Sequence, residues 1–185
     1  IAFGPRNMGL PEEEIAQRVV KAAKFCGLDE SLLDRSPFEL SGGQKRRAAI
    51  AGVIAMQPEV LVLDEPAAGL DPEGREMILS QVKKYHKETG TTVVLVSHSM
   101  EDIAKYADRV LVLQAGKLAM LDTTANIFSR AQELVMYGSS VPQITKIFLR
   151  LQEMGLEQPV DVYTVKYARD VILNALAKRG GGQDA

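Results

Sequence analysis

The sequence predicts an α/β fold in which helices pack on a parallel sheet. Two short runs, residues 60–63 and 92–96, the second apolar from Val93 onward, have the length and composition of parallel strands that are covered on both faces. A segment with helical periodicity separates them, and a third strand is expected at 109–113. This alternation of strands and helices is typical of strand–helix–strand units built on a parallel sheet.

The segment before the sheet is predicted to be mostly helical over residues 11–57. Pro11 and the three glutamates after it open a helix, since acids in the first turn complement the helix dipole. Gly27 closes this helix, and a short second helix is expected around Leu32 and Leu33. Ile15, Val19, Ala22, Ala23 and Cys26 give the first helix one apolar face.

The segment after the third strand begins with a hairpin turn at Ala115-Gly116, which leads into a strand at 117–121. A single helix is then expected, capped by Asp122 or Thr123 and running towards Met136.

A linker at Gly138-Ser139-Ser140 separates this part from a tail with two amphipathic helices, the second at 167–176. The apolar positions of the first tail helix are Ile144, Ile147, Phe148, Leu151 and Met154. A tail of this length is too short for an independent core, so we expect its apolar faces to meet another surface.

Composition limits the classes of function. The chain has 185 residues and a net charge of -2, which argues against a nucleic-acid-binding surface. Its one cysteine, Cys26, suits a reducing compartment. The sequence contains no apolar run of the roughly 20 residues that a membrane-spanning helix needs, so we expect any membrane role to depend on a partner.

Residues 40–71 carry the densest functional signal. Ser41 and Gln44 have the spacing of a capping box at the start of a helix that must stop by Pro58. Gly42 and Gly43 leave the first amides of that helix open to an anion, which the helix dipole favours. The densest basic cluster, Lys45-Arg46-Arg47, follows these glycines and is consistent with a phosphate neighbour.

Asp64 and Glu65 end the first apolar strand. The carboxyl ends of strands are where ligands bind in open α/β sheets. Adjacent acids are costly there unless a cation or a reaction uses them. Asp-Glu-Pro taken alone fits an ordinary acidic turn equally well, but LSGGQ at residues 40–44, one helix upstream, favours a functional site.

Four motifs occur together over residues 40–98: LSGGQ, VLVLDEP, AGLDP and a strand that ends in Ser97-His98. In order and spacing they resemble the nucleotide-binding subunit of ATP-binding cassette (ABC) transporters. The resemblance implies a P-loop NTPase-like fold in three parts. These would be a helical signature subdomain at 1–57, the C-terminal part of the ATPase core at 58–137 and a C-terminal helical dimerisation appendage at 138–185.

The opening IAFGPRN and the helical tail are most similar to ATPase subunits of energy-coupling factor (ECF) transporters, in which such a tail helps two ATPase subunits dimerise.

This resemblance implies ATP and Mg²⁺ as cofactors and gives the polar residues roles. Asp64 is expected to hold Mg²⁺ through water, since magnesium keeps much of its hydration. Glu65 is expected to polarise the attacking water, and His98, which would otherwise be a structural histidine, to contact the γ-phosphate. His86, among charged residues on a helix, is interpreted as part of a solvated face.

The resemblance also places residues at a dimer interface. Asp71 is expected to cap the helix that Pro72 begins, and its loop would also cross the interface between two subunits. Ser41, Gly42, Gly43 and Gln44 would close over the γ-phosphate of the ATP held by the opposing subunit.

Three features of the family are absent from these 185 residues: the phosphate-binding loop, the glutamine loop and the aromatic residue that stacks on adenine. The phosphate-binding loop, Gly-x-x-x-x-Gly-Lys followed by Ser or Thr, is not found; Gly4 and Gly9 have the interval, but Leu10 and Pro11 follow. We therefore expect the chain to be the C-terminal portion of an ATPase that is inactive as this portion alone.

The leading functional prediction is an ATPase subunit of an ECF-type importer that takes up a vitamin or a metal ion. Its partners would be a second ATPase subunit, identical or paralogous, a transmembrane coupling subunit and a substrate-binding membrane subunit, at the cytoplasmic face of the membrane. An ABC-type ATPase of DNA repair is disfavoured, because residues 11–40 lack sustained heptads and a basic face. A non-catalytic dimerisation module is the remaining alternative.

Overall fold

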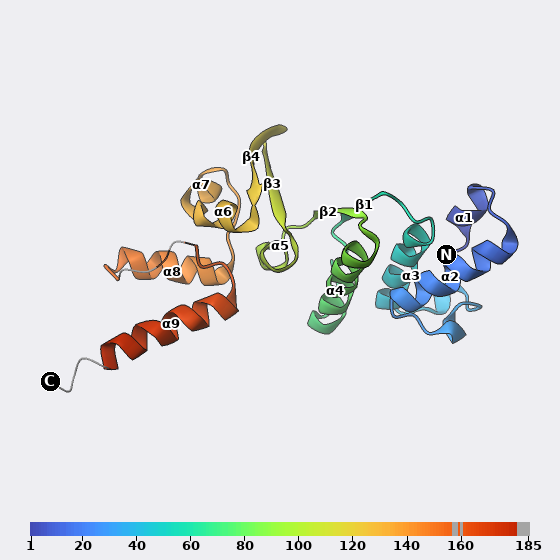
Figure 1. Cartoon of the computed structure of the whole chain (residues 1–185), viewed down its shortest axis with the longest axis horizontal. Coiled ribbons are helices and arrows are strands. Elements are labelled where there is room, and N and C mark those ends of the chain that lie inside the picture. The colour runs from blue at the N-terminus through green and yellow to red at the C-terminus, as the bar shows by residue number, and fades with distance from the viewer. Residues whose placement is uncertain (157–158, 160, 181–185) are drawn as a thin grey trace. The chain divides into compact units, whose positions relative to one another are not determined.

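The structure, a computed structural model, describes residues 1–156, 159 and 161–180. The chain groups into two compact units, Ile1–Ser97 and His98–Ala185 (Figure 1). The packing therefore divides at Ser97. Packing within one copy does not define functional regions, so the division into 1–57, 58–137 and 138–185 stays a prediction. Residues 181–185, at the end of the predicted appendage, lie outside the described residues.

The first unit begins with helices, as predicted. In order these are α1 (Phe3–Asn7), α2 (Glu12–Phe25), short 3₁₀ turns at Glu30–Leu32 and Pro37–Glu39, and α3 (Gly42–Ile54). Helix α2 starts directly after Pro11 and is followed by Gly27 at φ +67°, a left-handed conformation that glycine adopts at little cost.

The short helix expected around Leu32 and Leu33 is a single 3₁₀ turn at Glu30–Leu32, and a second 3₁₀ turn follows at Pro37–Glu39. Asp29 accepts a hydrogen bond from the amide of Ser31, and Ser36 accepts one from the amide of Phe38. Each local cap closes a turn of its own, so a continuous α-helix does not form.

The sheet of the first unit has two strands, β1 (Val60–Asp64) and β2 (Thr92–Val96), joined by α4 (Pro72–Thr89). The strands are parallel, and Asp64 pairs with Val96 at their carboxyl ends. Residues that follow either strand therefore start from the same edge of the sheet.

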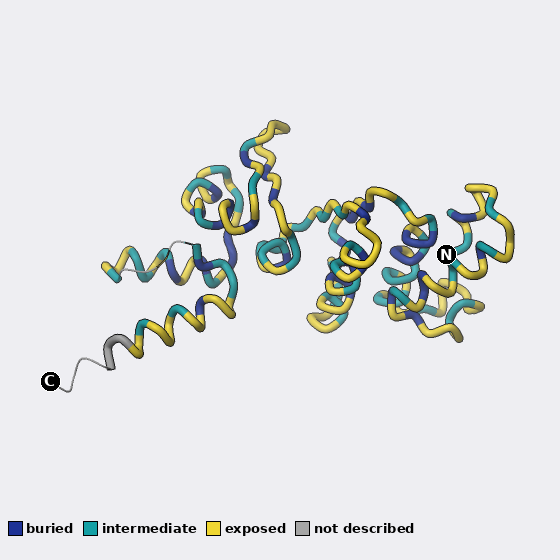
Figure 2. The backbone as a smooth tube through the Cα atoms, viewed as in Figure 1, coloured by how far each residue is buried: buried dark blue, intermediate teal, exposed yellow. Residues whose placement is uncertain are grey.

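One face of this sheet carries the core. Leu61 is 1% exposed and packs, with Leu63, against α3 and α4. The other buried members of this core are Ala22, Ala23, Cys26, Leu28, Ile50, Ala51, Ile54, Ala55, Ile78, Val82 and Tyr85. Helices α2, α3 and α4 are held together through this cluster (Figure 2).

The expectation that both faces of these strands are covered is wrong for the described chain. Val60 and Val62 are 55% and 63% exposed, and Val94 and Val96 are 45% and 46% exposed. Side chains alternate between the two faces of a strand, and the described residues of this unit supply helices to one face only.

The second unit contains α5 (Met100–Tyr106), the hairpin strands β3 (Arg109–Gln114) and β4 (Lys117–Thr123), and the helices α6 (Thr124–Ser129) and α7 (Ala131–Met136). The predicted hairpin turn is present, with Ala115 and Gly116 at φ 49° and 76°. β3 pairs antiparallel with β4 and forms a separate two-stranded sheet among the described residues, so it does not extend the parallel sheet.

The single helix expected after Thr123 is broken in two at Arg130, which has φ -98° and ψ 39°. Thr123 caps α6 by accepting a hydrogen bond from the amide of Asn126. At the other end, the Ser129 hydroxyl donates to the carbonyl of Asn126, a local bond that competes with helix continuation.

The tail forms α8 (Gln143–Glu153) and α9 (Val165–Gly180). Phe148, expected on a face that meets another surface, is buried against Val162 and Ala168 within this unit. Thr145 supports the same packing by donating its hydroxyl to the carbonyl of Val162 at 2.9 Å. Across the described part of the chain, no helix has the length and apolarity to cross a membrane.

Candidate functional site

The start of α3 has the predicted geometry. The amide of Gln44 donates to Ser41 Oγ at 3.2 Å, and Gln44 Oε1 accepts from the amide of Ser41 at 2.8 Å. This reciprocal capping box holds both side chains at the helix start.

Gly42 and Gly43 occupy the first positions of α3, where amides have no acceptor within the helix. A Cβ atom added to Gly42 would meet nothing within 4 Å, so the space before this helix end is open. A Cβ added to Gly43 would lie 3.8 Å from the side chain of Leu70, which places the turn before α4 beside the glycines. This open end can therefore receive an anion from outside the unit.

The two acids lie where β1 ends. Asp64 is the last residue of the strand and is exposed, whereas Glu65 is half-buried. The amide of Glu65 donates to the carbonyl of Val96 at 3.0 Å, which ties the turn to the end of β2. Glu65 has φ 45°, a left-handed conformation that costs a non-glycine residue roughly 1–3 kcal/mol. The surrounding contacts must hold it there.

Arg46 supplies one of those contacts, which the sequence did not indicate. Its Nε donates to the carbonyl of Pro66 at 2.8 Å, and its Nη2 donates to the carbonyl of Glu65. The sequence suggested a phosphate neighbour for the basic cluster, but these Arg46 donors contact backbone carbonyls instead. The only sequence signal was a cationic residue near the glycines, and cation charge alone does not distinguish a carbonyl from a phosphate.

Asp71 caps α4 as predicted. Its Oδ1 accepts a hydrogen bond from the amide of Gly74 at 2.7 Å, and Pro72 takes the first helical position. A Cβ at Gly74 would lie 2.9 Å from the same oxygen, so a larger residue there would require the Asp71 side chain to shift.

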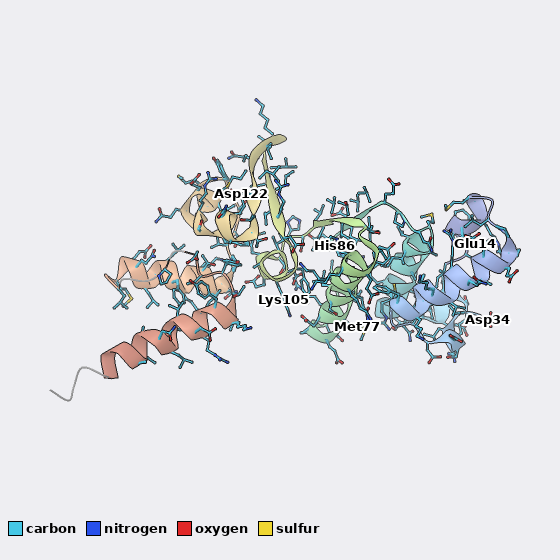
Figure 3. The ribbon with its side chains drawn as sticks, in the orientation of Figure 1. Glu14, Asp34, Met77, His86, Lys105 and Asp122 are labelled. Atoms are coloured by element: carbon cyan, nitrogen blue, oxygen red, sulfur yellow. The ribbon has the colours of Figure 1, made fainter. Side chains whose placement is uncertain are left out.

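The histidines are in different situations. Ser97 and His98 follow β2 directly, but Ser97 closes the first unit and His98 opens the second, where it is exposed. His86 lies on α4, and its Nδ1 is 2.9 Å from the carbonyl of Thr91 (Figure 3). The prediction that His86 belongs to a solvated face is therefore wrong, because the ring is half-buried and contacts the loop before β2.

The described residues contain no cluster of three or more His, Cys, Asp or Glu side chains able to hold a metal ion. Mg²⁺ typically uses one or two carboxylates, water and substrate phosphates rather than a protein cage, so a single carboxylate can serve as its protein ligand. The exposed carboxylate of Asp64 fits that need.

A cavity of about 570 Å³ lies at the other end of the sheet, where Glu59 precedes β1 and Thr91 precedes β2. Its walls include Arg18 and Phe25 of α2 and Tyr85 of α4. None of the predicted site residues lines it, so it is separate from the carboxyl edge that carries Asp64 and Glu65.

Comparison with known proteins bears on this arrangement. The family model described as ABC transporter matches residues 6–68. The energy-coupling factor transporter ATP-binding protein EcfA2 of Clostridium perfringens is 50% identical over 177 residues, 95% of this chain and 62% of that protein. EcfA2 of Symbiobacterium thermophilum is 52% identical over 181 residues, 98% of this chain and 62% of that protein. The chain contains part of an ABC transporter ATPase domain.

Solved structures confirm the predicted ABC ATPase fold. A structure of cbiO1 from Clostridium perfringens, part of the ABC transporter complex cbiONQ, has a TM-score of 0.64 at 40% identity, covering 83% of this chain and 57% of that one. A dimeric ATP-binding cassette bound to ADP and Pi has a TM-score of 0.55 at 31% identity, covering 62% and 49%. This ABC ATPase chain spans 62% of the length of each EcfA2 relative described above.

Proposed function

We propose that this chain provides the signature helix and the catalytic carboxylate of an ATP-hydrolysing subunit in an ECF-type importer. The observation that carries the proposal is the packing of α3 against the segment between β1 and α4. Gly43 lies beside Leu70, and Arg46 contacts Glu65, so the open helix end and the acid turn form one assembly. Identity of 50% to an energy-coupling factor ATP-binding protein supports the class of transporter.

The proposed chemistry follows from the requirements of phosphoryl transfer, which are bound phosphates, a cation, an oriented water and charge stabilisation. Asp64 would hold Mg²⁺ through water, and Mg²⁺ bound there would supply neutralisation of the phosphate charge. Glu65 polarises the attacking water as general base, a role worth about 10²- to 10⁴-fold in rate. His98 contacts the γ-phosphate and senses its presence.

The open end of α3 acts on the ATP of an opposing subunit. A helix N-terminus attracts an anion by about 0.3–2 kcal/mol, too little to hold ATP by itself. Gly42 and Gly43, positioned by Ser41 and Gln44, are therefore suited to closing over ATP that is already bound elsewhere. Asp71 and its turn lie at the same interface, so ATP joins two subunits.

The tail contributes to dimerisation in this proposal. Apolar side chains of the tail remain exposed after Phe148 is buried: Ile147 on α8, Met154 directly after α8, and Val165, Tyr167, Ile172, Leu173 and Leu176 on α9. Exposed apolar positions on paired helices mark surfaces for protein association. The surface to test is therefore this exposed set, rather than Phe148, whose replacement would disrupt the unit itself.

The remaining partners are a transmembrane coupling subunit and a substrate-binding membrane subunit, which place the ATPase at the cytoplasmic face of the membrane. The cargo is a vitamin or a metal ion, and nucleic acid is not a partner. A structure of cbiO1, part of the cbiONQ complex, supports such an assembly by similarity.

Turnover of the intact subunit, assembled with its membrane partners, tests the catalytic part. Glu65→Gln is expected to abolish most ATP hydrolysis while ATP binding persists, and Glu13→Gln, the same change at an exposed position of α2, should leave both intact. Hydrolysis at the parent rate in Glu65→Gln would contradict the assignment. Salt-sensitive binding to DNA would favour the DNA-repair alternative instead.

Sedimentation tests the tail. Ile147→Glu and Leu173→Glu should weaken self-association, whereas Lys146→Glu, a charge change at an exposed site on α8, should not. The non-catalytic alternative predicts association that is unchanged by ATP in the intact subunit, and the ATPase proposal predicts association that ATP strengthens.

A further inference from the structure

Arg46 connects the signature helix to the turn after β1. From the first half of α3, its guanidinium donates to two successive backbone carbonyls, those of Glu65 and Pro66. Arg46 is half-buried, and Pro66 is buried. A guanidinium presents its donors in a rigid planar fork, so it can engage two neighbouring acceptors at once.

The backbone of Glu65 is fastened in two further directions. Its amide donates to Val96 at the end of β2, and its carbonyl accepts from the amide of Ala68 at 3.1 Å as well as from Arg46. Glu65 nevertheless has φ 45°, where a residue with a side chain is rarely stable without support. Such strained positions persist only when the surrounding structure holds them.

We propose that Arg46 is a positioning residue for Glu65: it holds the left-handed backbone of the turn and thereby sets the direction of the catalytic carboxylate. Arg46 does not touch substrate in this proposal. Its donors face carbonyl groups, so its role differs from that of a phosphate-binding cation.

The contact has a mechanical consequence, which rests on the proposed function of Glu65 and of the α3 glycines. Arg46 lies on the helix that begins at Gly42 and Gly43, and the capping box ties Ser41 to Gln44 at that helix start. A displacement of α3 when its open end meets a phosphate is therefore passed through Arg46 to the backbone of Glu65. Closure of α3 over the ATP of the opposing subunit is thereby coupled to orientation of the general base of its own subunit.

The proposal can be tested without nucleotide, by hydrogen exchange of backbone amides in the full 185-residue chain. Arg46→Met removes all donors and keeps the aliphatic length, and it should speed exchange at Glu65 and Ala68 by at least fivefold. Arg35→Met is a matched control, because Arg35 is exposed in the same unit. Amides of Ile50 and Ala51 within α3 should exchange at the parent rate in both variants. Unchanged exchange at Ala68 in Arg46→Met would overturn the proposal.

A second background separates conformational support from general packing. Glycine adopts a left-handed φ without the penalty that Glu65 bears. Arg46→Met should therefore accelerate exchange at Ala68 less in a Glu65→Gly chain than in the parent chain. An equal acceleration in both backgrounds would show that Arg46 acts by packing alone and would overturn the proposal.

Turnover then tests the catalytic consequence in the intact subunit. Misplacing a catalytic group by about 1 Å costs up to about 10²-fold in rate. Arg46→Met should lower kcat about 10- to 100-fold with KM for ATP changed less than twofold, and Arg46→Lys should recover only part of the rate. If Glu65→Gln retains full turnover, the proposed function fails, but the exchange result still decides whether Arg46 holds the turn. If Glu65→Gln is inactive while Arg46→Met has the parent kcat, only the inference about Arg46 is overturned.

Discussion

Asp71 has two roles that a pair of substitutions can separate: the cap of α4 and a proposed contribution at the dimer interface. Its Oδ1 accepts the amide of Gly74 at 2.7 Å, a hydrogen bond that Asp71→Ala removes. Loss of such a cap costs about 0.5–2 kcal/mol, typically about 1. In a unit the size of Ile1–Ser97, about 1 kcal/mol lowers the melting temperature by about 4–8 °C.

Thermal unfolding followed by circular dichroism measures this cost in the chain. Asp71→Asn and Asp71→Ser retain a side-chain oxygen and should melt within about 2 °C of the parent, since all three residues cap helices comparably well. Gly74→Ala should destabilise less than Asp71→Ala, because its Cβ only requires Oδ1 to shift from 2.9 Å while the donor amide and the accepting oxygen both remain. Equal destabilisation by Asp71→Asn and Asp71→Ala would refute the capping argument.

The interface role predicts a different pattern in the intact subunit. Asp71→Asn keeps the cap but removes the charge, so a contribution of that charge across the dimer should appear as lower ATP turnover at unchanged stability. If Asp71→Asn retains the parent ATP turnover and the parent stability, Asp71 acts only as a cap.

Three further predictions concern the whole chain, its core and its cysteine. The 185 residues alone should show no magnesium-dependent ATP hydrolysis in a phosphate-release assay, since their sequence contains no phosphate-binding loop; measurable activity would contradict this. Leu61→Ala should lower the free energy of unfolding by about 2–5 kcal/mol in urea titrations, whereas Val62→Ala, on the exposed face, should cost less than about 1; similar losses at both sites would mean that the core is misassigned. Burial raises the pKa of the Cys26 thiol from 9.0 to about 12, so between these values the unfolded thiol loses its proton and the folded one keeps it. Stability should therefore fall as pH rises through this window, more steeply in the parent chain than in Cys26→Ala, and equal pH dependence would argue against a buried thiol.

Parts of the site could be predicted because their determinants are local. Ser41 and Gln44 form their capping box within one helical turn, and Asp71 caps α4 through Gly74 in the same way. The strands could also be predicted, because a continuous apolar run as short as Val60–Leu63 favours a buried strand over a helix. Because β1 and β2 are parallel, the residues that follow them start from the same edge of the sheet.

Other features depended on which surfaces meet. The valines of β1 and β2 have the composition of strands buried on both faces, yet one face is exposed in the described chain. Phe148 and Ile147 are neighbours on an amphipathic helix, and only the packing of Val162 and Ala168 decides that Phe148 is the buried one. The break at Arg130 arises from local hydrogen bonds that periodicity does not reveal.

The sequence by itself determined the order of the motifs and the family that they resemble, and it predicted which residues would handle a triphosphate, because these depend on residue type and spacing along the chain. Only the tertiary structure decided that Arg46 contacts the carbonyls of Glu65 and Pro66 and that Glu65 has a left-handed backbone. The physical reason is that a hydrogen bond between α3 and the turn after β1 requires both elements to be packed on the same core. A guanidinium has the same chemistry in the sequence whether it later meets a phosphate or a carbonyl.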